Sequence, residues 1–285
     1  MMRLEDVFYG QFEIEGVLKD LIDSEPVQRL KNIHQGGAIF LVSPHLNHNR
    51  YEHSIGVMLL VRKLGASLEE QIAALLHDIS HTAFSHVIDY VLKQNGEDYH
   101  ERIFEEVIGD SIIPSVLAKH GFSTALLEDP TYTLLEMPLP ALCADRIDYT
   151  IRDLYHSGLI SSVEVYNFIN ELGVQEGKIG VKSEKAASWI AGKYLQLNKE
   201  YFRKPEHIFA NLRLSQLIAL GLENNVIVLS DLRGDDLAVL SMMRLNPYLN
   251  SELDKIKFLE GFENFNASEP GITFKSRLLQ PMIIE

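Results

Sequence analysis

Cysteine is almost absent from this chain, which contains only Cys143 in its 285 residues. A single cysteine excludes an intrachain disulfide, so we expect a reducing compartment, the cytoplasm. The N-terminal segment MMRLEDVFYG carries Glu5 and Asp6 and lacks the apolar run of a signal peptide. The longest segment without Asp, Glu, Lys or Arg runs from Asn32 to Asn49 and holds three histidines, two glycines and a proline. We therefore expect no membrane-spanning segment.

Basic residues are few relative to acidic ones. Lys and Arg number 26 and Asp and Glu number 40, which gives a formal net charge of −14. This excess of negative charge argues against binding to nucleic acid or to an anionic membrane surface. A small anionic substrate remains compatible with it, because a metal ion and a few local basic residues can reverse the sign of the potential inside a pocket.

Internal repeats, low-complexity tracts and Gly/Ser-rich linkers are also absent from the sequence, and helical periodicity dominates it. We expect a first helix after Asp23 or Ser24 that ends at Gly36-Gly37. Further helices are expected over residues 50–64, 67–77, a short stretch through 91, 98–109, 134–158 with its prolines near the entry, and 184–202.

Two regions depart from the helical pattern. The segment LGVQEGKIGVK at residues 172–182 alternates apolar residues about a Gly177 turn, which predicts a short β-hairpin. Near the C-terminus, VIVLSD at residues 226–231 and GITFKS at 271–276 read as short strands. We therefore predict a mostly α fold, with a helical domain over residues 1–225 and a small α+β appendage over residues 226–285 packed on it.

Histidines and aspartates cluster where core would be expected, in ALLHDISHTAFSHVID at residues 74–89. Candidate metal ligands occur in three separated segments: His53, the pair His77-Asp78, and Asp145. Neutral imidazole and carboxylate oxygen suit divalent ions such as Mn, Fe, Zn, Ni or Mg. Each segment lies on or at the end of a predicted helix, so a helical bundle could bring the ligands together in its core.

Simpler interpretations exist for each piece alone. A single histidine in a helix is more often a hydrogen-bonded core or surface group than a ligand. His77 and His81 share a face only if their helix continues. Asp145, Tyr149 and Asp153 follow one another at four-residue spacing, which a solvated surface stripe would also produce. The four candidate ligands taken together favour a metal site.

The same segments carry a family resemblance. LIDSEPVQRLKNIHQGG, HNRYEHSIGV, ALLHDISHTAFSHVID, YHERI and ADRIDYTIRDLYHSGL occur in the order found in HD-domain metal-dependent phosphohydrolases. More narrowly, the chain resembles the dNTP triphosphohydrolase branch, with its SAM-and-HD-domain enzymes and bacterial relatives. The match covers roughly residues 4–159 and continues more loosely to about 225. It implies an HD-domain helical bundle and an HD phosphohydrolase domain over residues 1–225.

The resemblance also implies residue roles. The metal ligands would be His53, His77, Asp78 and Asp145. His81, His86 and His100 match pocket histidines, with Asp89 and Glu101 matching the acids behind them. Either His86 with Asp89 or His100 with Glu101 would protonate the leaving oxygen.

Substrate contacts follow by the same comparison. Arg50, Arg146 and Lys193 match phosphate-binding positions, and Gln35, Tyr149, Asp153 and Tyr201 match residues that hold the sugar and exclude a 2′-hydroxyl. Core packing is an equally good interpretation for the two tyrosines, and a solvated helix face is a better one for Lys193.

The sequence departs from the family pattern beside the phosphates. The family commonly has HDLGHGPFSH, and this chain has HDISHTAFSH, with Ser80 and Thr82 replacing glycines and Ala83 replacing proline. A family histidine of the sugar pocket corresponds to Leu197, and DPIHG is only half kept at residues 6–10. These changes leave the ligand set intact and bear on substrate choice.

The leading hypothesis is therefore a cytoplasmic enzyme that converts a dNTP to a deoxynucleoside and triphosphate, by attack of water on the α-phosphorus. The alternatives are a phosphohydrolase of nucleoside monophosphates or a signalling nucleotide, and a nucleotide-binding sensor. In each case the partner is a small nucleotide, and we expect a homo-oligomer, a dimer or a tetramer.

Overall fold

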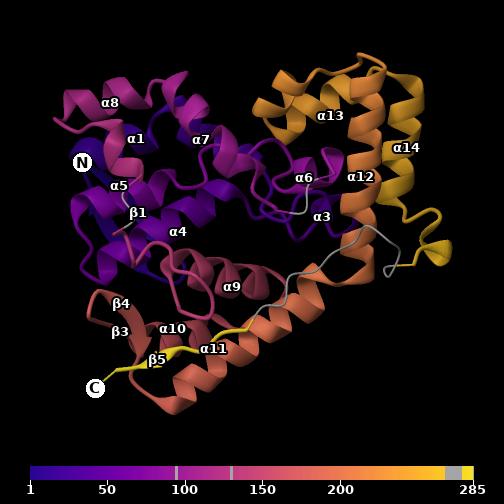
Figure 1. Cartoon of the computed structure of the whole chain (residues 1–285). Helices are drawn as coiled ribbons and strands as arrows, with labels where there is room; N and C mark the ends of the chain where they lie inside the picture. Colours follow the sequence, from indigo (N-terminus) through magenta and orange to yellow (C-terminus); the bar gives the residue numbers. More distant parts are fainter. Residues whose placement is uncertain (94–95, 129–130, 267–277, 285) are drawn as a thin grey trace.

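The computed structural model describes residues 1–93, 96–128, 131–266 and 278–284 and is mostly helical (Figure 1). The helices are α1 Gly16–Ile22, α2 Glu25–Arg29, α3 Ile39–Val42, α4 Arg50–Lys63, α5 Leu68–Leu76, α6 Val87–Val91, α7 Tyr99–Gly109, α8 Ile113–Lys119, α9 Ala144–His156, α10 Ser162–Asn170, α11 Glu184–Leu197, α12 Pro205–Glu223, α13 Asp236–Arg244 and α14 Pro247–Lys257. The strands are β1 Met2–Asp6, β2 Gly10–Ile14, β3 Leu172–Gln175, β4 Lys178–Val181 and β5 Met282–Ile283. The predicted mostly α class and the hairpin at β3 and β4 are confirmed.

The central helices begin where the sequence supplies caps. The Asn49 side chain accepts the Glu52 N–H at the start of α4, and the Ser67 side chain accepts the Glu70 N–H at the start of α5. Helix α4 is buried on nearly all sides from His53 to Val61, because α5 and α9 both pack against it. The three helices that carry the candidate ligands therefore meet in the main core.

Four local predictions need correction or lie outside the described residues. The helix after Ser24 ends at Arg29 and gives way to a 3₁₀ turn, Leu30–Asn32. Residues 134–143 are not helical, since Pro138 and Pro140 interrupt the segment before α9. VIVLSD does not form a strand, because the Asp231 carboxylate accepts the Val228 N–H and starts the 3₁₀ helix Leu229–Arg233. GITFKS lies outside the described residues.

The structure also adds a hairpin that the periodicity did not predict. Strands β1 and β2 pair antiparallel from Met2↔Ile14 to Asp6↔Gly10. This hairpin carries Tyr9 and Asp6 toward α9, where they enter the network described below. Strand β5 pairs parallel with β4 and so returns the C-terminal segment to the main body.

A second hydrophobic cluster lies at the end of the molecule formed by α12, α13 and α14 (Figure 1). It combines Phe84 and Val87 from the turn before α6 and from α6 with Leu214 of α12, Val239 of α13 and Leu253 of α14. This cluster thus combines residues from before and after position 225, where we expected the domain boundary. The boundary stays a prediction. Among the described helices, none combines the length and apolarity needed to cross a bilayer.

Gly56 of α4 faces Asp148 and Arg152 of α9, and it provides a test of this packing. A Cβ at Gly56 would collide with Asp148 and the Arg152 guanidinium, whereas a Cβ at Gly192 in α11 would meet no atom within 4 Å. We expect Gly56→Ala to lower the free energy of unfolding by about 1–3 kcal/mol through overpacking. Gly192→Ala should raise it by about 0.5–1 kcal/mol through helix propensity alone. Urea denaturation of both variants measures the contrast, and a Gly56→Ala protein as stable as wild type would contradict the packing.

Candidate functional site

The four predicted metal ligands converge on one point between α4, α5 and α9. His53 lies within α4, His77 and Asp78 follow the end of α5, and Asp145 lies in the first turn of α9. His53 Nε2 is 3.0 Å from Asp145 Oδ1, 3.3 Å from His77 Nε2 and 3.5 Å from Asp78 Oδ2. His77 Nε2 is 3.5 Å from Asp145 Oδ1 and 3.6 Å from Asp78 Oδ1. Three segments far apart in sequence thus present four donors to one small volume.

The orientation of the two imidazoles tests whether these donors suit a cation. His53 Nδ1 faces the Asp148 carboxylate at 2.9 Å, and His77 Nδ1 faces the Ala74 carbonyl at 2.8 Å. Because both acceptors require a proton on Nδ1, each neutral ring turns the lone pair of Nε2 toward the other ring and toward two carboxylates. Such lone pairs repel one another unless a cation lies among them, and they form the set that divalent metals bind. The residues present therefore fit a divalent ion.

The pKa values of His53 and Asp78 also show that the cluster favours positive charge. Burial lowers the pKa of His53, but the carboxylates of Asp145 and Asp148 outweigh burial and bring that pKa to about 10. Burial raises the pKa of Asp78, but Arg50 and the nearby histidines hold it well below its usual range. The cluster therefore stabilises added positive charge.

Asp148 is a residue that the sequence reasoning missed. It is fully buried and accepts hydrogen bonds from Tyr9 Oη at 2.8 Å and from Arg152 Nε and Nη2, each at 2.8 Å, in addition to its contact with His53. A carboxylate behind a metal-binding imidazole fixes the tautomer of the ring and raises its basicity. The available signal was spacing, since Asp148 and Arg152 lie four residues apart in a predicted helix and each follows a buried-type residue, Ile147 and Ile151.

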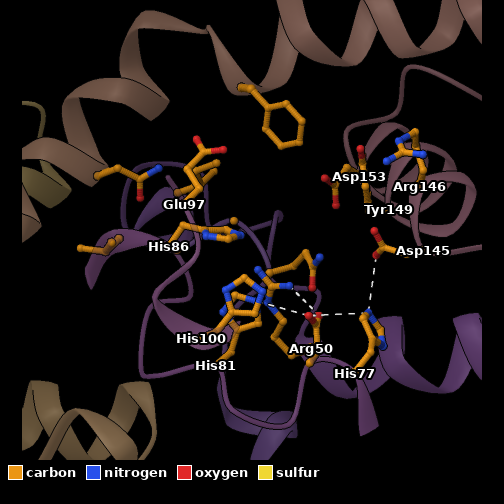
Figure 2. Close-up of a pocket in the computed structure, with 18 of the residues that line it drawn as sticks. Arg50, His77, His81, His86, Glu97, His100, Asp145, Arg146, Tyr149 and Asp153 are labelled. Carbon is orange, nitrogen blue, oxygen red and sulfur yellow. Dashed lines mark hydrogen bonds and ion pairs between the residues drawn. The ribbon is translucent and has the colours of Figure 1, made fainter. Parts of the chain in front are cut away.

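The cavity histidines form a second group beside Asp78. His81 Nε2 is 3.2 Å from Asp78 Oδ1, and the rings of His81 and His100 stack with centroids 3.9 Å apart (Figure 2). Burial lowers the pKa of His100 to about 3. His86 differs, because its side chain is 40% exposed and its Nδ1 lies 3.2 Å from Asp89 Oδ2. The structure thus brings Asp89 behind His86 as expected.

Glu101 lines the same cavity but is exposed, and among the described residues no hydrogen bond or ion pair joins it to His100. His100 Nδ1 is buried without a hydrogen-bond partner among the described residues. Of the two predicted pairs, only His86 with Asp89 is formed.

Arg50 joins the ligand cluster to the cavity wall. Its Nη1 donates to Asp78 Oδ2 at 2.6 Å, and its Nε donates to Ser85 Oγ at 2.9 Å. The side chain is buried and lines the cavity, as Figure 2 shows. A guanidinium held in this way is pre-organised to bind an anion without losing much conformational freedom.

The cavity itself has a volume of about 560 Å³ and opens beside the ligand cluster. Gln35, Tyr149 and Asp153 line it, so the structure brings three of the four expected sugar-binding residues to the site. Tyr149 Oη lies 3.2 Å from Tyr194 Oη, and Asp153 Oδ1 lies 2.6 Å from His48 Nε2. The fourth, Tyr201, is buried beneath Gly36 and is not among the cavity-lining residues.

Two of the expected phosphate-binding cations are placed differently from the prediction. Arg146 borders the cavity, but its Nη1 donates to the Met137 and Ala141 carbonyls and its Nη2 to Glu136. Lys193 is not among the cavity-lining residues, because α11 directs its ammonium toward Glu164, 3.9 Å away, and toward Gln196. Only Arg50 therefore reaches the ligand cluster as the sequence pattern suggested.

Comparison with known proteins places the chain in a family. A sequence model of the HD domain matches residues 50–153. The chain is 49% identical over 245 residues to the uncharacterized protein YdhJ of Bacillus subtilis (strain 168), covering 85% of this chain and 75% of that protein. It is 36% identical over 223 residues to the metal-dependent phosphohydrolase cns2 of Cordyceps militaris, covering 75% of this chain and 65% of that protein.

The name of a less similar relative states its substrate. The chain is 27% identical over 231 residues to the deoxynucleoside triphosphate triphosphohydrolase SAMHD1 of Danio rerio, covering 62% of this chain and 37% of that protein. The chain thus spans less than two thirds of the length of either named phosphohydrolase. The HD match includes both ends of the ligand set, from α4 to α9. The chain belongs to the HD-domain family and is a metal-dependent phosphohydrolase that uses a divalent ion.

Proposed function

We propose that this site hydrolyses a phosphoester of a nucleotide, with His53, His77, Asp78 and Asp145 holding the divalent ion. The observation that carries the proposal is the meeting of this ligand set with Arg50 and the His86–Asp89 pair on one cavity. When bound, the ion supplies a Lewis acid and lowers the pKa of a coordinated water. The residues of the chain bind the phosphate, orient it and move the proton.

Arg50 is the residue that we assign to the phosphate. Its contacts with Asp78 and Ser85 fix the guanidinium plane at the cavity wall beside the ligands. Arginine in this arrangement donates to phosphate oxygens and neutralises their charge. This local cation offsets the net negative charge of the whole chain where the substrate binds.

His86 is the residue that we assign to the leaving oxygen. Asp89 lies behind the ring and orients it, and the partial exposure of His86 lets it meet a substrate in the cavity. His100 suits this role less well, because burial keeps it neutral and leaves no proton to donate from an imidazolium at neutral pH. We therefore propose that His86 protonates the 5′-oxygen as the phosphoester breaks.

A dNTP is the first substrate candidate. The similarity to a dNTP triphosphohydrolase supports it, together with the lining of the cavity by Gln35, Tyr149 and Asp153. With a dNTP, water attacks the α-phosphorus and the products are deoxynucleoside and triphosphate.

A nucleoside monophosphate or another small phosphate is the second candidate, and the cation positions favour it. Arg146 already serves backbone carbonyls and Glu136, and Lys193 lies outside the cavity lining. Of the three cations that the sequence pattern assigned to phosphate, only Arg50 contacts the ligand cluster, and a single phosphate beside Arg50 requires fewer cations than a triphosphate.

A product assay distinguishes the candidates. Mn-loaded protein is incubated with each dNTP, each NTP and a set of nucleoside monophosphates, and the products are separated by ion exchange, with Asp78→Ala as the blank. Deoxynucleoside with inorganic triphosphate is the result expected for the first candidate, and orthophosphate from monophosphates for the second. Nucleotide binding without any product would contradict the hydrolase proposal and point to a sensor.

We further propose that the protein forms at least a dimer and resides in the cytoplasm. Resemblance to oligomer-forming HD enzymes supports the first statement, and the single free, buried Cys143 fits a reducing compartment. Light scattering at micromolar concentration tests the oligomer, and a monomer there would contradict it.

A further inference from the structure

The turn that joins His81 to His86 has an unusual backbone. Phe84 has φ of 62° and Ser85 has φ of 52°, so two consecutive non-glycine residues lie in the left-handed region. Residues with a Cβ are disfavoured there, and such a conformation persists only where surrounding contacts impose it. Because His86 follows directly, this turn decides where the His86 ring meets the cavity.

The contacts that impose the turn come from the C-terminal part of the chain. Asp236, the first residue of α13, is fully buried, and its Oδ1 accepts the Phe84 N–H at 2.6 Å. Its Oδ2 accepts the His34 N–H at 3.0 Å and lies 2.7 Å from His34 Nδ1. The Leu232 carbonyl accepts the Ala83 N–H at 2.8 Å. The amides of Ala83 and Phe84, at the start of the turn, are therefore held by Leu232 and Asp236, which both lie in the chain after residue 225.

Hydrogen bonds connect the turn to the ligand cluster. Ser85 Oγ donates to the His34 carbonyl at 2.7 Å and accepts from Arg50 Nε at 2.9 Å. Arg50 in turn donates to Asp78 Oδ2 at 2.6 Å. A continuous series of hydrogen bonds thus runs from Asp236 through His34 and Ser85 to Arg50 and Asp78.

Capping of α13 does not account for Asp236. The neighbouring Asp235 is the N-cap, and its Oδ1 accepts the Ala238 N–H at 2.9 Å. The Asp236 carboxylate instead points into the protein, where burial without a lysine or arginine partner is unfavourable. One oxygen of this buried carboxylate faces the Phe84 amide and the other faces His34. Holding the turn and His34 in place is the role that explains its burial.

We propose that Asp236 is a positioning residue, which sets His86 and Arg50 for phosphoester hydrolysis by holding the turn at Phe84 and Ser85. The catalytic part of this inference rests on the proposed function. The C-terminal helices are then a required part of the site, because they carry a contact that the residues before 225 do not replace.

The test compares Asp236→Asn with Asp235→Ala. In Asp236→Asn, one oxygen becomes an NH₂ group that cannot accept an N–H, so the side chain can no longer accept from the Phe84 and His34 amides together, while its shape is kept. We expect kcat to fall by about 10- to 100-fold, with KM changed by less than about threefold and with metal content unchanged. The kcat is measured on the nucleotide that the wild type hydrolyses. Hydrogen exchange of the amides of residues 83–86 should become at least about tenfold faster.

Asp235→Ala is the matched control, because it removes the helix cap without touching the turn. It should lower thermal stability while keeping wild-type kcat and wild-type exchange at residues 83–86. Ser85→Ala is the second variant if Asp236→Asn does not fold, and it should lower kcat with metal retained.

Wild-type kcat and exchange in Asp236→Asn, or in Ser85→Ala where that variant is used, would overturn the proposal, as would an equal loss of kcat in Asp235→Ala. If the wild type hydrolyses no nucleotide, the proposed function fails. The exchange measurement then decides separately whether Asp236 holds the turn, and unchanged exchange overturns that part.

Discussion

Asp78→Ala is expected to purify without its divalent ion and to lose at least about 10³-fold in kcat, since the ion contributes several kcal/mol to the transition state and each 1.36 kcal/mol is tenfold. Asp78 contacts both the other ligands and the cavity wall. Its carboxylate lies within 3.6 Å of His53, His77 and His81, and it also accepts from Arg50. Metal content measured by mass spectrometry and kcat on the hydrolysed nucleotide are the two readouts.

The loss of Asp78 also leaves Arg50 buried without its carboxylate partner. Uncompensated burial of a charge lowers the free energy of unfolding, so Asp78→Asn, which keeps the shape of the side chain, should accompany the alanine variant. Asp89→Asn is the control for metal binding. It should retain the ion while kcat falls by about 10- to 100-fold, because Asp89 supports His86 and is not a ligand. An Asp78→Ala protein with wild-type metal content would contradict the ligand assignment.

Asp148→Ala is expected to produce the largest loss of stability, about 3–5 kcal/mol in the free energy of unfolding. Asp148 is fully buried, and its removal strands Arg152 and Tyr9 in the core between α9 and the N-terminal hairpin. Asp6 Oδ2 still accepts from Arg152 Nη2 at 3.0 Å, which limits the loss but does not replace the bidentate contact.

Urea denaturation measures this loss, with Asp23→Ala as the control. Asp23 pairs with Lys19 at 2.6 Å on the surface, and removing an exposed pair, which solvent screens, should change stability far less than removing Asp148. Equal effects of the two substitutions would show that the Asp148 network does not stabilise the fold.

The Asp148→Asn variant separates metal binding from folding. An amide has one acceptor end, so it cannot accept both at the Oδ2 position, which faces His53 Nδ1 and Arg152 Nε, and at the Oδ1 position, which faces Tyr9 Oη and Arg152 Nη2. Even with the amide oxygen toward His53, the acceptor has lost its negative charge, so it fixes the tautomer and raises the basicity of the ring less, and we expect Mn²⁺ affinity to weaken by about 10- to 100-fold. A titration followed by the electron paramagnetic resonance signal of free Mn²⁺ measures the change, and unaltered affinity would exclude a role for Asp148 behind the ligand.

Local patterns predicted most of the helices and the candidate ligand set. Asn49 and Ser67 mark the starts of α4 and α5, and apolar spacing follows each of them. These signals lie within a few residues of one another, so they can be read along the chain. The His, His-Asp and Asp segments were likewise recognisable, because their chemistry and order do not depend on the details of packing.

Only the tertiary structure decided which candidates face the cavity and which residues support them. Arg146 and Lys193 fit the sequence pattern equally well, yet loop carbonyls hold the first and Glu164 draws the second away. His53 meets Asp148 across 95 residues and His34 meets Asp236 across 202. The physical reason is that a side chain's partner depends on how distant helices pack, whereas capping and periodicity act within a single turn or helix.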